Sequence, residues 1–295
     1  MQPCVTSAIT CAASAKNGMT AILLVICLSC YTSAVDQVKP KEFKIPDLPV
    51  VAHRGFSYEY PENTVAAAKG AIAVKAEGCE FDIYISRDDV VFVLHDGTFN
   101  RTTDVETEII DGKPKPVKIA DLSFEEIREL DAGSWKDAKF AGEKIPTLDE
   151  MLAALKVTKC RPVIEIKQGG FERQVIDAVK RAEMEDCTVI ISFSKDVVIK
   201  IRRLAPKIPV AWLWGDKWEK SDEELVEFLV AVAIEVDTNM LDLAHTHLNA
   251  NVIKGLNDAG ITVWSWTIDD PVRMAELRKA GVVSITTNRP DIARP

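Results

Sequence analysis

The sequence predicts an α/β fold, specifically a TIM-type (β/α)8 barrel with a small inserted subdomain after the second strand. Three observations predict this class: eight short runs are rich in β-branched residues, helical patterns alternate with them, and the whole alternation fits within residues 50–295. Alternating strands and helices build a parallel sheet that helices cover. Eight such units in a segment of this length favour a closed barrel over an open sheet.

The predicted strands are short runs of Val, Ile and Thr with some aromatic residues. They lie at 50–53, 79–85, 162–166, 188–193, 210–214, 233–237, 262–267 and 283–287. Helices are predicted where apolar residues recur at helical spacing between these strands. They lie at 64–76, 174–185, 195–204, 223–232, 250–259 and 272–280.

The second strand is followed by an interruption of this pattern. An apolar run at 90–94 comes after a turn at 87–89 and is expected to pair back against that strand. The polar stretch beyond it includes a helical segment at 123–130, whose Ser-Phe-Glu-Glu start resembles a capping box. We interpret residues 97–147, as approximate bounds, as an inserted subdomain of a single barrel domain at 50–295.

Composition and charge exclude some classes of function. The chain has 295 residues, of which 47% are hydrophobic and 27% charged, as in ordinary globular proteins. Its formal net charge of −9 argues against a general nucleic-acid binder, because counterion release from phosphates needs a basic surface. An anionic substrate would therefore have to meet local positive charge or a metal.

The N-terminal segment differs from the rest of the chain. Residues 1–34 hold one charged residue, Lys16, and the apolar run at 21–30 is too short to span a bilayer but suits a signal peptide. We predict a signal peptide at 1–34, a Pro-containing linker at 35–49, and export to the periplasm or the exterior. Lipidation at Cys30 is disfavoured because the preceding residues lack the aliphatic residue of a bacterial lipobox, and an uncleaved anchor is disfavoured by length.

The cysteines do not indicate a disulfide framework. Outside the leader lie Cys79, Cys160 and Cys187, an odd number with no C-x-x-C spacing. Neither a zinc site nor a set of disulfides follows from this pattern. A single bridge between two of the three stays open in an exported protein.

Polar residues gather at the predicted strand ends, where barrels of this class carry their active sites. His53 ends the first strand, and His95 follows the run at 90–94. Glu80 and Asp82 are two residues apart on the second strand and so point to the same face. Glu165 on the third strand is in phase with them.

Three inward carboxylates at one barrel mouth require a counter-charge, because like charges a few ångströms apart raise one another's pKa. A divalent cation bound by Glu80, Asp82 and Glu165 would supply it. Ligands that are all oxygen suit Mg²⁺, Ca²⁺ or Mn²⁺ better than zinc. Two of the four histidines, His53 and His95, could divide general-base and general-acid roles beside this site.

Eight short motifs in order resemble the glycerophosphodiester phosphodiesterase family, a group of phospholipase C-like barrels. They are His53-Arg-Gly55, Pro61-Glu-Asn-Thr64, Glu80-Phe-Asp82, His95-Asp96, Arg101-Thr-Thr103, Glu165-Ile-Lys167, Trp266-Thr267, and Gly281 through Thr287-Asn288-x-Pro290. The resemblance covers residues 50–293 and extends to the family's insertion. It implies metal-dependent hydrolysis of a small-molecule glycerophosphodiester to glycerol 3-phosphate and an alcohol.

The resemblance also implies roles for individual residues. His53 and His95 would be the acid/base pair, and Arg54 and Lys167 would contact the phosphate. Trp266 is expected to face the glycerol. The expected role of Glu62 and Asn63 is to organise the first βα loop.

Two departures from the family pattern stand out. The family usually has Asn after Trp-Thr-Val, where this chain has Asp269-Asp270, and its usual Gly-Val-Asp is here Gly281-Val282-Val283. Neither touches the expected metal or acid/base set. The first could alter selectivity near the glycerol.

Two other functions stay open at this point. One is a phospholipase-type phosphodiesterase acting on intact lipids or wall-derived diesters. No apolar loop long enough to insert into a bilayer is evident, so we expect no stable membrane partner and favour the soluble diester. The other is a non-catalytic periplasmic diester-binding protein, against which the complete acid/base and carboxylate set argues.

Overall fold

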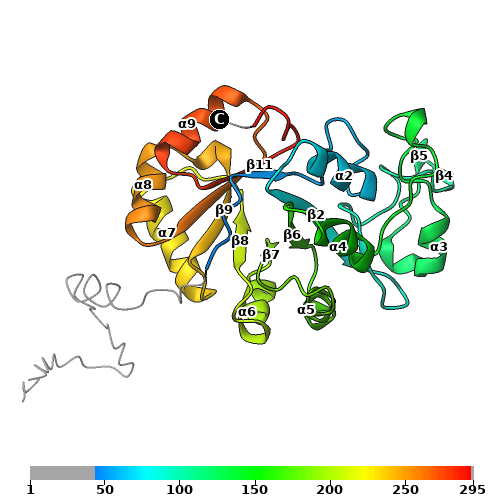
Figure 1. The fold of residues 1–295 in the computed structure, drawn as a ribbon, viewed down its shortest axis with the longest axis horizontal. Helices are drawn as coiled ribbons and strands as arrows, with labels where there is room; N and C mark the ends of the chain where they lie inside the picture. Colours follow the sequence, from blue (N-terminus) through cyan, green and yellow to red (C-terminus); the bar gives the residue numbers. More distant parts are fainter. Residues whose placement is uncertain (1–43, 294–295) are drawn as a thin grey trace, which may run out of the picture. The chain divides into compact units, whose positions relative to one another are not determined.

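Eight parallel strands close into a ring in the computed structural model, which describes residues 44–293 (Figure 1). In order around the ring they are β1 (Val50–Ala52), β2 (Gly78–Ile85), β6 (Arg161–Ile166), β7 (Val189–Ser192), β8 (Val210–Trp214), β9 (Met240–Ala244), β10 (Thr262–Trp266) and β11 (Ser284–Thr287). Pairing of β1 with both β2 and β11 completes the ring. The predicted (β/α)8 barrel is confirmed.

Helices connect successive strands of the ring. They are α2 (Val65–Ala73), α4 (Leu148–Lys156), α5 (Glu172–Arg181), α6 (Lys195–Leu204), α7 (Asp222–Glu235), α8 (Ala250–Asp258) and α9 (Pro271–Ala280). Side chains at their first turns define several of these starts: Thr64 accepts a hydrogen bond from the Ala67 N–H, and Thr147 forms a capping box with Glu150. No helix within residues 44–293 has the length and apolar character needed to cross a bilayer.

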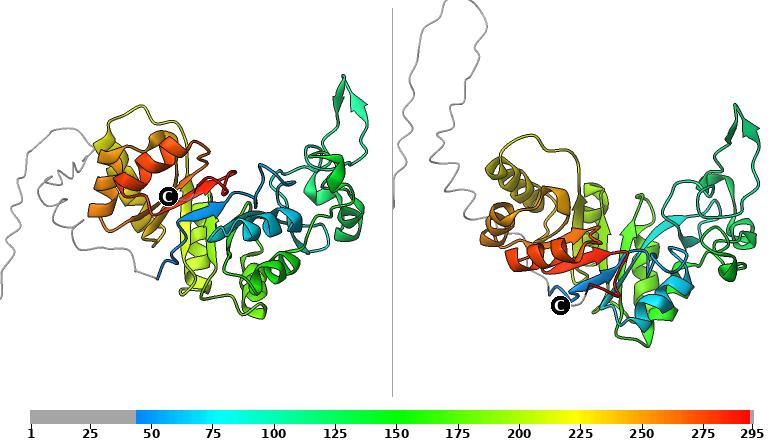
Figure 2. Two further views of the ribbon diagram at one scale, coloured as in Figure 1. Left: turned by 45° about the horizontal axis from the view of Figure 1, so that its top comes forward. Right: turned by 90° about the horizontal axis from the view of Figure 1, so that it is seen from above.

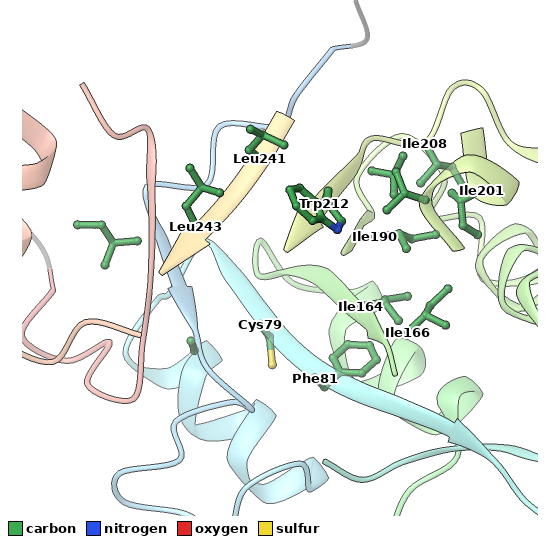
Figure 3. Packing of buried hydrophobic residues seen from close by; sticks show 14 of the residues in the cluster. Cys79, Phe81, Ile164, Ile166, Ile190, Ile201, Ile208, Trp212, Leu241 and Leu243 are labelled. Atoms are coloured by element: carbon green, nitrogen blue, oxygen red, sulfur yellow. The ribbon is translucent and has the colours of Figure 1, made fainter. Parts of the chain in front are cut away.

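Side chains alternate between two faces of the barrel wall. Phe81, Ile164 and Ile166 point to the outer face, where they pack in the large apolar cluster shared with the helices (Figure 3). A second cluster, which includes Val163, fills the interior of the ring. Because this alternation has a period of two, the outward positions of Phe81 and Ile164 fix Glu80, Asp82 and Glu165 as inward.

One predicted strand is wrong. Residues 233–237 are not a strand but the end of α7 and the turn after it, and the sixth strand of the ring is β9, at Met240–Ala244. In α7 the buried Leu225, Leu229 and Val232 recur at helical spacing. The three residues Ile234-Glu-Val236 alternate like a strand, but so short a run does not distinguish a strand from a helix end.

The insertion after the second strand follows the prediction in outline. The run predicted to pair back is β3 (Val91–Val93), antiparallel to β2. Beyond it come the hairpin strands β4 (Ile109–Ile110) and β5 (Lys113–Pro114), which project from the barrel (Figure 2), and α3 (Phe124–Glu129). Ser123 and Glu126 form the expected capping box. A separate apolar cluster around Phe99 and Ile127 gives this segment its own core.

The domain begins before residue 50. Leu48 is buried and Ile45 packs against the interior cluster of the ring, so the last residues of the predicted 35–49 linker belong to the barrel. The Ser284 hydroxyl donates a hydrogen bond to the Leu48 carbonyl, which ties this segment to β11. The predicted signal peptide at 1–34 and the first part of the linker lie outside the described residues.

Gly55, directly after β1, has no room for a side chain. Its φ is +78°, and an added Cβ would lie 2.6 Å from the carbonyl carbon of Ala67. Gly112 in the projecting hairpin has a similar φ of +75° but nothing within 4 Å of an added Cβ. Both glycines therefore adopt a left-handed backbone conformation, but only Gly55 also lies against a neighbouring residue.

We expect Gly112→Ala to lower the free energy of unfolding by about 1–2 kcal/mol, because only the left-handed conformation is penalised. Gly55→Ala should cost about 1–3 kcal/mol more, because α2 must also move. Urea unfolding of both variants checks this. Equal losses would contradict the close approach of α2 to the first loop.

Candidate active site

A cavity of about 220 Å³ opens at the carboxyl ends of the barrel strands. Seven of the residues singled out from the sequence line it: His53, Arg54, Glu80, His95, Glu165, Lys167 and Trp266. Ile191, Phe193, Leu213, Asp242 and Thr286 complete the lining. Of the remaining three predicted site residues, Glu62 and Asp82 contact side chains of the first group, and Asn63 binds Asp82. The residues singled out from the sequence therefore lie together around one cavity.

Three carboxylates converge at the cavity wall. One oxygen of each of Glu80, Asp82 and Glu165 lies within 4.8 Å of the others, and all three residues are buried. Asp82 and Glu165 are register partners on neighbouring strands. Burial and the charges of Asp82 and Glu165 raise the pKa of Glu80 well above its usual value. Burial and Asp82 likewise raise the pKa of Glu165 to about 8.

This cluster fits a hard divalent cation. The Oε1 atom of Glu80 is buried and has no hydrogen-bond partner in the described part of the chain, while its Oε2 accepts a hydrogen bond from the Arg54 N–H at 2.8 Å. An orphaned carboxylate oxygen facing two other carboxylates is costly unless a cation binds there. Oxygen donors alone suit Mg²⁺ or Ca²⁺.

Two positively charged side chains, those of Lys167 and Arg54, lie beside the carboxylates. The Nζ atom of Lys167 lies 2.8 Å from Glu165 Oε1 and 3.3 Å from Asp82 Oδ1. The Nε atom of Arg54 lies 3.5 Å from Asp82 Oδ2, and its Nη1 donates to Glu62 at 2.8 Å. Burial alone would raise the pKa of Asp82, but Lys167 and Arg54 hold it below its usual value.

The first βα loop positions these groups through backbone conformation. Arg54 and Asn63 both adopt the left-handed region, with φ of 55° and 61°. The Asn63 side chain donates to Asp82 Oδ2 at 2.8 Å and accepts from the Asp82 N–H at 3.2 Å. Glu62 accepts hydrogen bonds from both Arg54 and Arg101. Asn63 thus links the loop to the inward carboxylate of Asp82, and Glu62 binds the guanidinium groups of Arg54 and Arg101.

His53 is held by a neutral partner. Its Nδ1 lies 2.7 Å from Oδ1 of Asn288, an amide oxygen that can only accept a hydrogen bond. Nδ1 therefore carries the proton, and Nε2 keeps its lone pair. Burial, with a further contribution from the Arg54 charge, lowers the pKa of His53 to about 4. The ring is accordingly neutral at neutral pH.

His95 is held by a charged partner. Its Nδ1 lies 2.6 Å from Asp96 Oδ1, and Arg101 binds the same carboxylate, with Nε 2.6 Å from Asp96 Oδ2. Although burial opposes it, the hydrogen bonds from Arg101 and His95 lower the pKa of Asp96 to about 2. Asp96 is therefore a carboxylate that can stabilise an imidazolium.

Asp242 is the charged residue of the cavity that sequence reasoning missed. It is 1% exposed, and neither carboxylate oxygen has a hydrogen-bond partner among the described residues. Burial, with the nearby Glu165, raises the pKa of Asp242 well above its usual value. With the strand placed at 240–244, an acid between two leucines would have marked an inward site residue; the misplaced strand at 233–237 hid it.

Trp266 and Asp269, two further residues discussed from the sequence, have different surroundings. Trp266 does face the cavity, donates to the Asp242 carbonyl at 3.1 Å and packs edge-on against Phe193 at 5.5 Å between ring centroids. Asp269, one of the two residues whose departure from the family pattern could alter selectivity near the glycerol, directs its carboxylate at Thr287 and Asn288.

Comparisons with known proteins identify the family of this chain. The model of the glycerophosphoryl diester phosphodiesterase family matches residues 53–292. A glycerophosphodiester phosphodiesterase of Caldanaerobacter subterraneus is 31% identical over 251 residues, which cover 82% of this chain and 94% of that protein.

Solved structures match over the same part of the chain. A glycerophosphodiester phosphodiesterase from Agrobacterium tumefaciens has a TM-score of 0.69 at 26% identity and covers 83% of this chain and 98% of its own. A phosphodiesterase from Oleispira antarctica, in complex with the product sn-glycerol-3-phosphate, has a TM-score of 0.70 at 25% identity, with coverage of 83% and 95%. The chain belongs to the glycerophosphoryl diester phosphodiesterase family and is a phosphodiester hydrolase.

Proposed function

We propose that this enzyme hydrolyses small glycerophosphodiesters to glycerol 3-phosphate and an alcohol, with one divalent cation and with His53 and His95 as the base and acid. The observation that carries the proposal is the placement of two differently partnered histidines on one cavity with a buried carboxylate triad. The product bound to the Oleispira antarctica relative supports this substrate class.

Charge in the cavity suits a phosphodiester anion. Arg54 and Lys167 line the cavity and are available to the non-bridging oxygens of the phosphate. A divalent cation held by Glu80, Asp82 and Glu165 would add positive charge where negative charge develops on the phosphoryl oxygens. Mg²⁺ or Ca²⁺ fits the donors, and Mn²⁺ is compatible with them.

The two histidines differ in the direction in which they can move a proton. His53 is neutral and offers Nε2 as an acceptor, so it takes the proton of the attacking hydroxyl group, whether that of water or of the substrate's own glycerol. His95, backed by Asp96, gives a proton to the oxygen of the leaving alcohol as the P–O bond breaks. The edge-on pair of Trp266 and Phe193 gives the carbon atoms of the glycerol an apolar wall.

We also propose that the protein is exported to the periplasm or the exterior. The support is the composition of residues 1–34, which combine an apolar run with a small-residue segment at 32–34. Sequencing the N-terminus of the protein isolated from its source checks this, with a mature start near residue 35 as the expected result.

Removal of divalent metal should abolish hydrolysis of glycerophosphocholine, and Mg²⁺ or Ca²⁺ should restore it. Glu80→Gln and Glu165→Gln should each lower kcat by about 10²-fold or more, because each removes a negative ligand of the cation. The measurement is release of glycerol 3-phosphate with and without chelator. Asp149→Asn, at an exposed ion pair with Arg181, is the matched control and should retain full activity. Full turnover in excess chelator would refute metal dependence.

His53→Ala and His95→Ala should each lower kcat by about 10²–10⁴-fold, the usual range of a general acid or base. Asp96→Asn should lower kcat less than His95→Ala does, because it weakens the support of the His95 ring but does not remove the ring. Steady-state kinetics on a diester panel measure these effects. His247→Ala is the control, since that ring packs on Trp214 and does not line the cavity. Rates like the wild type in either active-site variant would exclude that residue.

The contribution of His53 to the free energy of unfolding should fall as pH decreases from about 6.5 to about 4. In the unfolded chain a histidine takes up a proton near pH 6.5, whereas folded His53 does so near pH 4, so in this window position 53 binds more protons in the unfolded state. Urea unfolding of metal-free protein at pH 7 and 4.5 measures the change. The buried carboxyls, whose raised pKa values act in the opposite direction, are present in the wild type and in His53→Asn alike. The wild type should therefore lose free energy of unfolding relative to His53→Asn between these two pH values. An unchanged difference would mean that His53 titrates normally.

A further inference from the structure

Asp269, just after β10, reaches the end of β11 through three hydrogen bonds. Its Oδ1 accepts from the Asn288 N–H and from the Thr287 hydroxyl, each at 2.8 Å. Its Oδ2 accepts from Nδ2 of Asn288 at 2.7 Å. Both donor groups of Asn288, in the main chain and in the side chain, are thus bound by one carboxylate.

This carboxylate decides which way the Asn288 amide faces. An amide presents a donor on one side and an acceptor on the other, and the two arrangements have nearly the same shape. Because a carboxylate offers only acceptors, Nδ2 must point to Asp269 and Oδ1 must point away from it. There Oδ1 accepts from the Ser57 hydroxyl at 2.9 Å and from His53 Nδ1 at 2.7 Å.

The orientation of the amide in turn decides the tautomer of His53. With Oδ1 facing the ring, the proton must be on Nδ1, since the other tautomer would set two lone pairs against each other. The main chain of His53 is fixed at the same place, because its N–H donates to the Thr287 carbonyl at 2.8 Å. The end of β11 therefore holds both the backbone and the ring of the proposed base.

We propose that Asp269 is a positioning residue for catalysis: through Asn288 it fixes the Nδ1–H tautomer of His53 and leaves Nε2 free to accept a proton. The inference rests on the proposed function of His53 as the base. The family usually has Asn where this chain has Asp269, and the inference gives this difference a structural role. An amide at 269 would present a donor as well as an acceptor and would not by itself fix the Asn288 side chain.

Other charges around His53 stay constant in the variants that test this. Arg54 lowers the pKa of His53, and Asp82 and Glu62 raise it, all from β2 or the first loop. Asp269 also acts on His245, which lies near Arg273 at the start of α9. Neither of these two contacts Asn288 or His53 by any hydrogen bond within residues 44–293.

The test compares Asp269→Asn, Asp269→Ala, Asn288→Asp and the exchange Asp269→Asn/Asn288→Asp. The two Asp269 variants should lower kcat for glycerophosphocholine by about 10–10²-fold, with KM changed less than about twofold, because the base loses its fixed tautomer but the substrate contacts remain. Asn288→Asp should also be impaired, since it sets two carboxylates against each other.

The exchange variant separates positioning from a merely structural role. It restores one carboxylate and one amide in contact, so it should recover kcat at least about tenfold over either single variant. Its carboxylate now faces His53, so the acidic limb of the kcat/KM profile should move to higher pH. Asp270→Asn is the matched control: that neighbouring side chain caps α9, a role Asn fills equally well.

A readout without turnover keeps the inference separate from the proposed function. In ¹⁵N spectra of the imidazole, wild-type His53 should be the Nδ1–H tautomer, and Asp269→Asn should show a mixture. An unchanged tautomer, a kcat within twofold of wild type in both Asp269 variants, or no recovery in the exchange variant would each overturn the inference. A shifted tautomer in a protein whose wild type and His53→Ala variant hydrolyse no diester would instead refute the proposed function.

Discussion

The structure depends on one electrostatic constraint: the mouth of the barrel buries several carboxylates within a few ångströms. Glu80, Asp82 and Glu165 converge, and Asp242 lies in the same cavity. Ionised groups in such a place destabilise one another unless counter-charges and hydrogen bonds reach them. Most of the surrounding architecture supplies these. Lys167 contacts two of the acids, and Asn63 satisfies Asp82 from the first loop.

The first βα loop adopts unfavourable backbone conformations because it supplies hydrogen bonds to these buried carboxylates. Arg54 and Asn63 adopt positive φ, and Gly55 between them lies against α2 with no space for a side chain. Each of these conformations is unfavourable alone, at a cost of about 1–2 kcal/mol for a residue with a side chain. Together they turn one main-chain N–H toward Glu80 and one amide toward Asp82. The local cost is offset by stabilising acids that would otherwise be isolated.

Sequence reasoning succeeded where a signal is local and failed where it is not. The spacing of Glu80 and Asp82, or of Glu165 and Lys167, reports a face of a strand directly, because the period is two. Residues 233–237 were misassigned because a helix end and a short strand look alike over three residues, and Asp242 was lost with that strand. The partner of His53 could not be inferred at all, since Asn288 is 235 residues away and only the closed ring brings them together.

The two ends of the barrel sequence, joined by the pairing of β1 with β11, contribute different parts of the site. The carboxylate triad comes entirely from β2 and β6, two strands of the first half that pair with each other. The setting of the proposed base comes from the last strand, through the hydrogen bonds that reach His53 across the closing seam. A barrel that opened only at this seam would keep its acids assembled but lose the hydrogen bonds that hold His53. If His53 is the base, as proposed, ring closure is a condition for chemistry as well as for stability, and a nascent chain would stay inert until its final strand has docked.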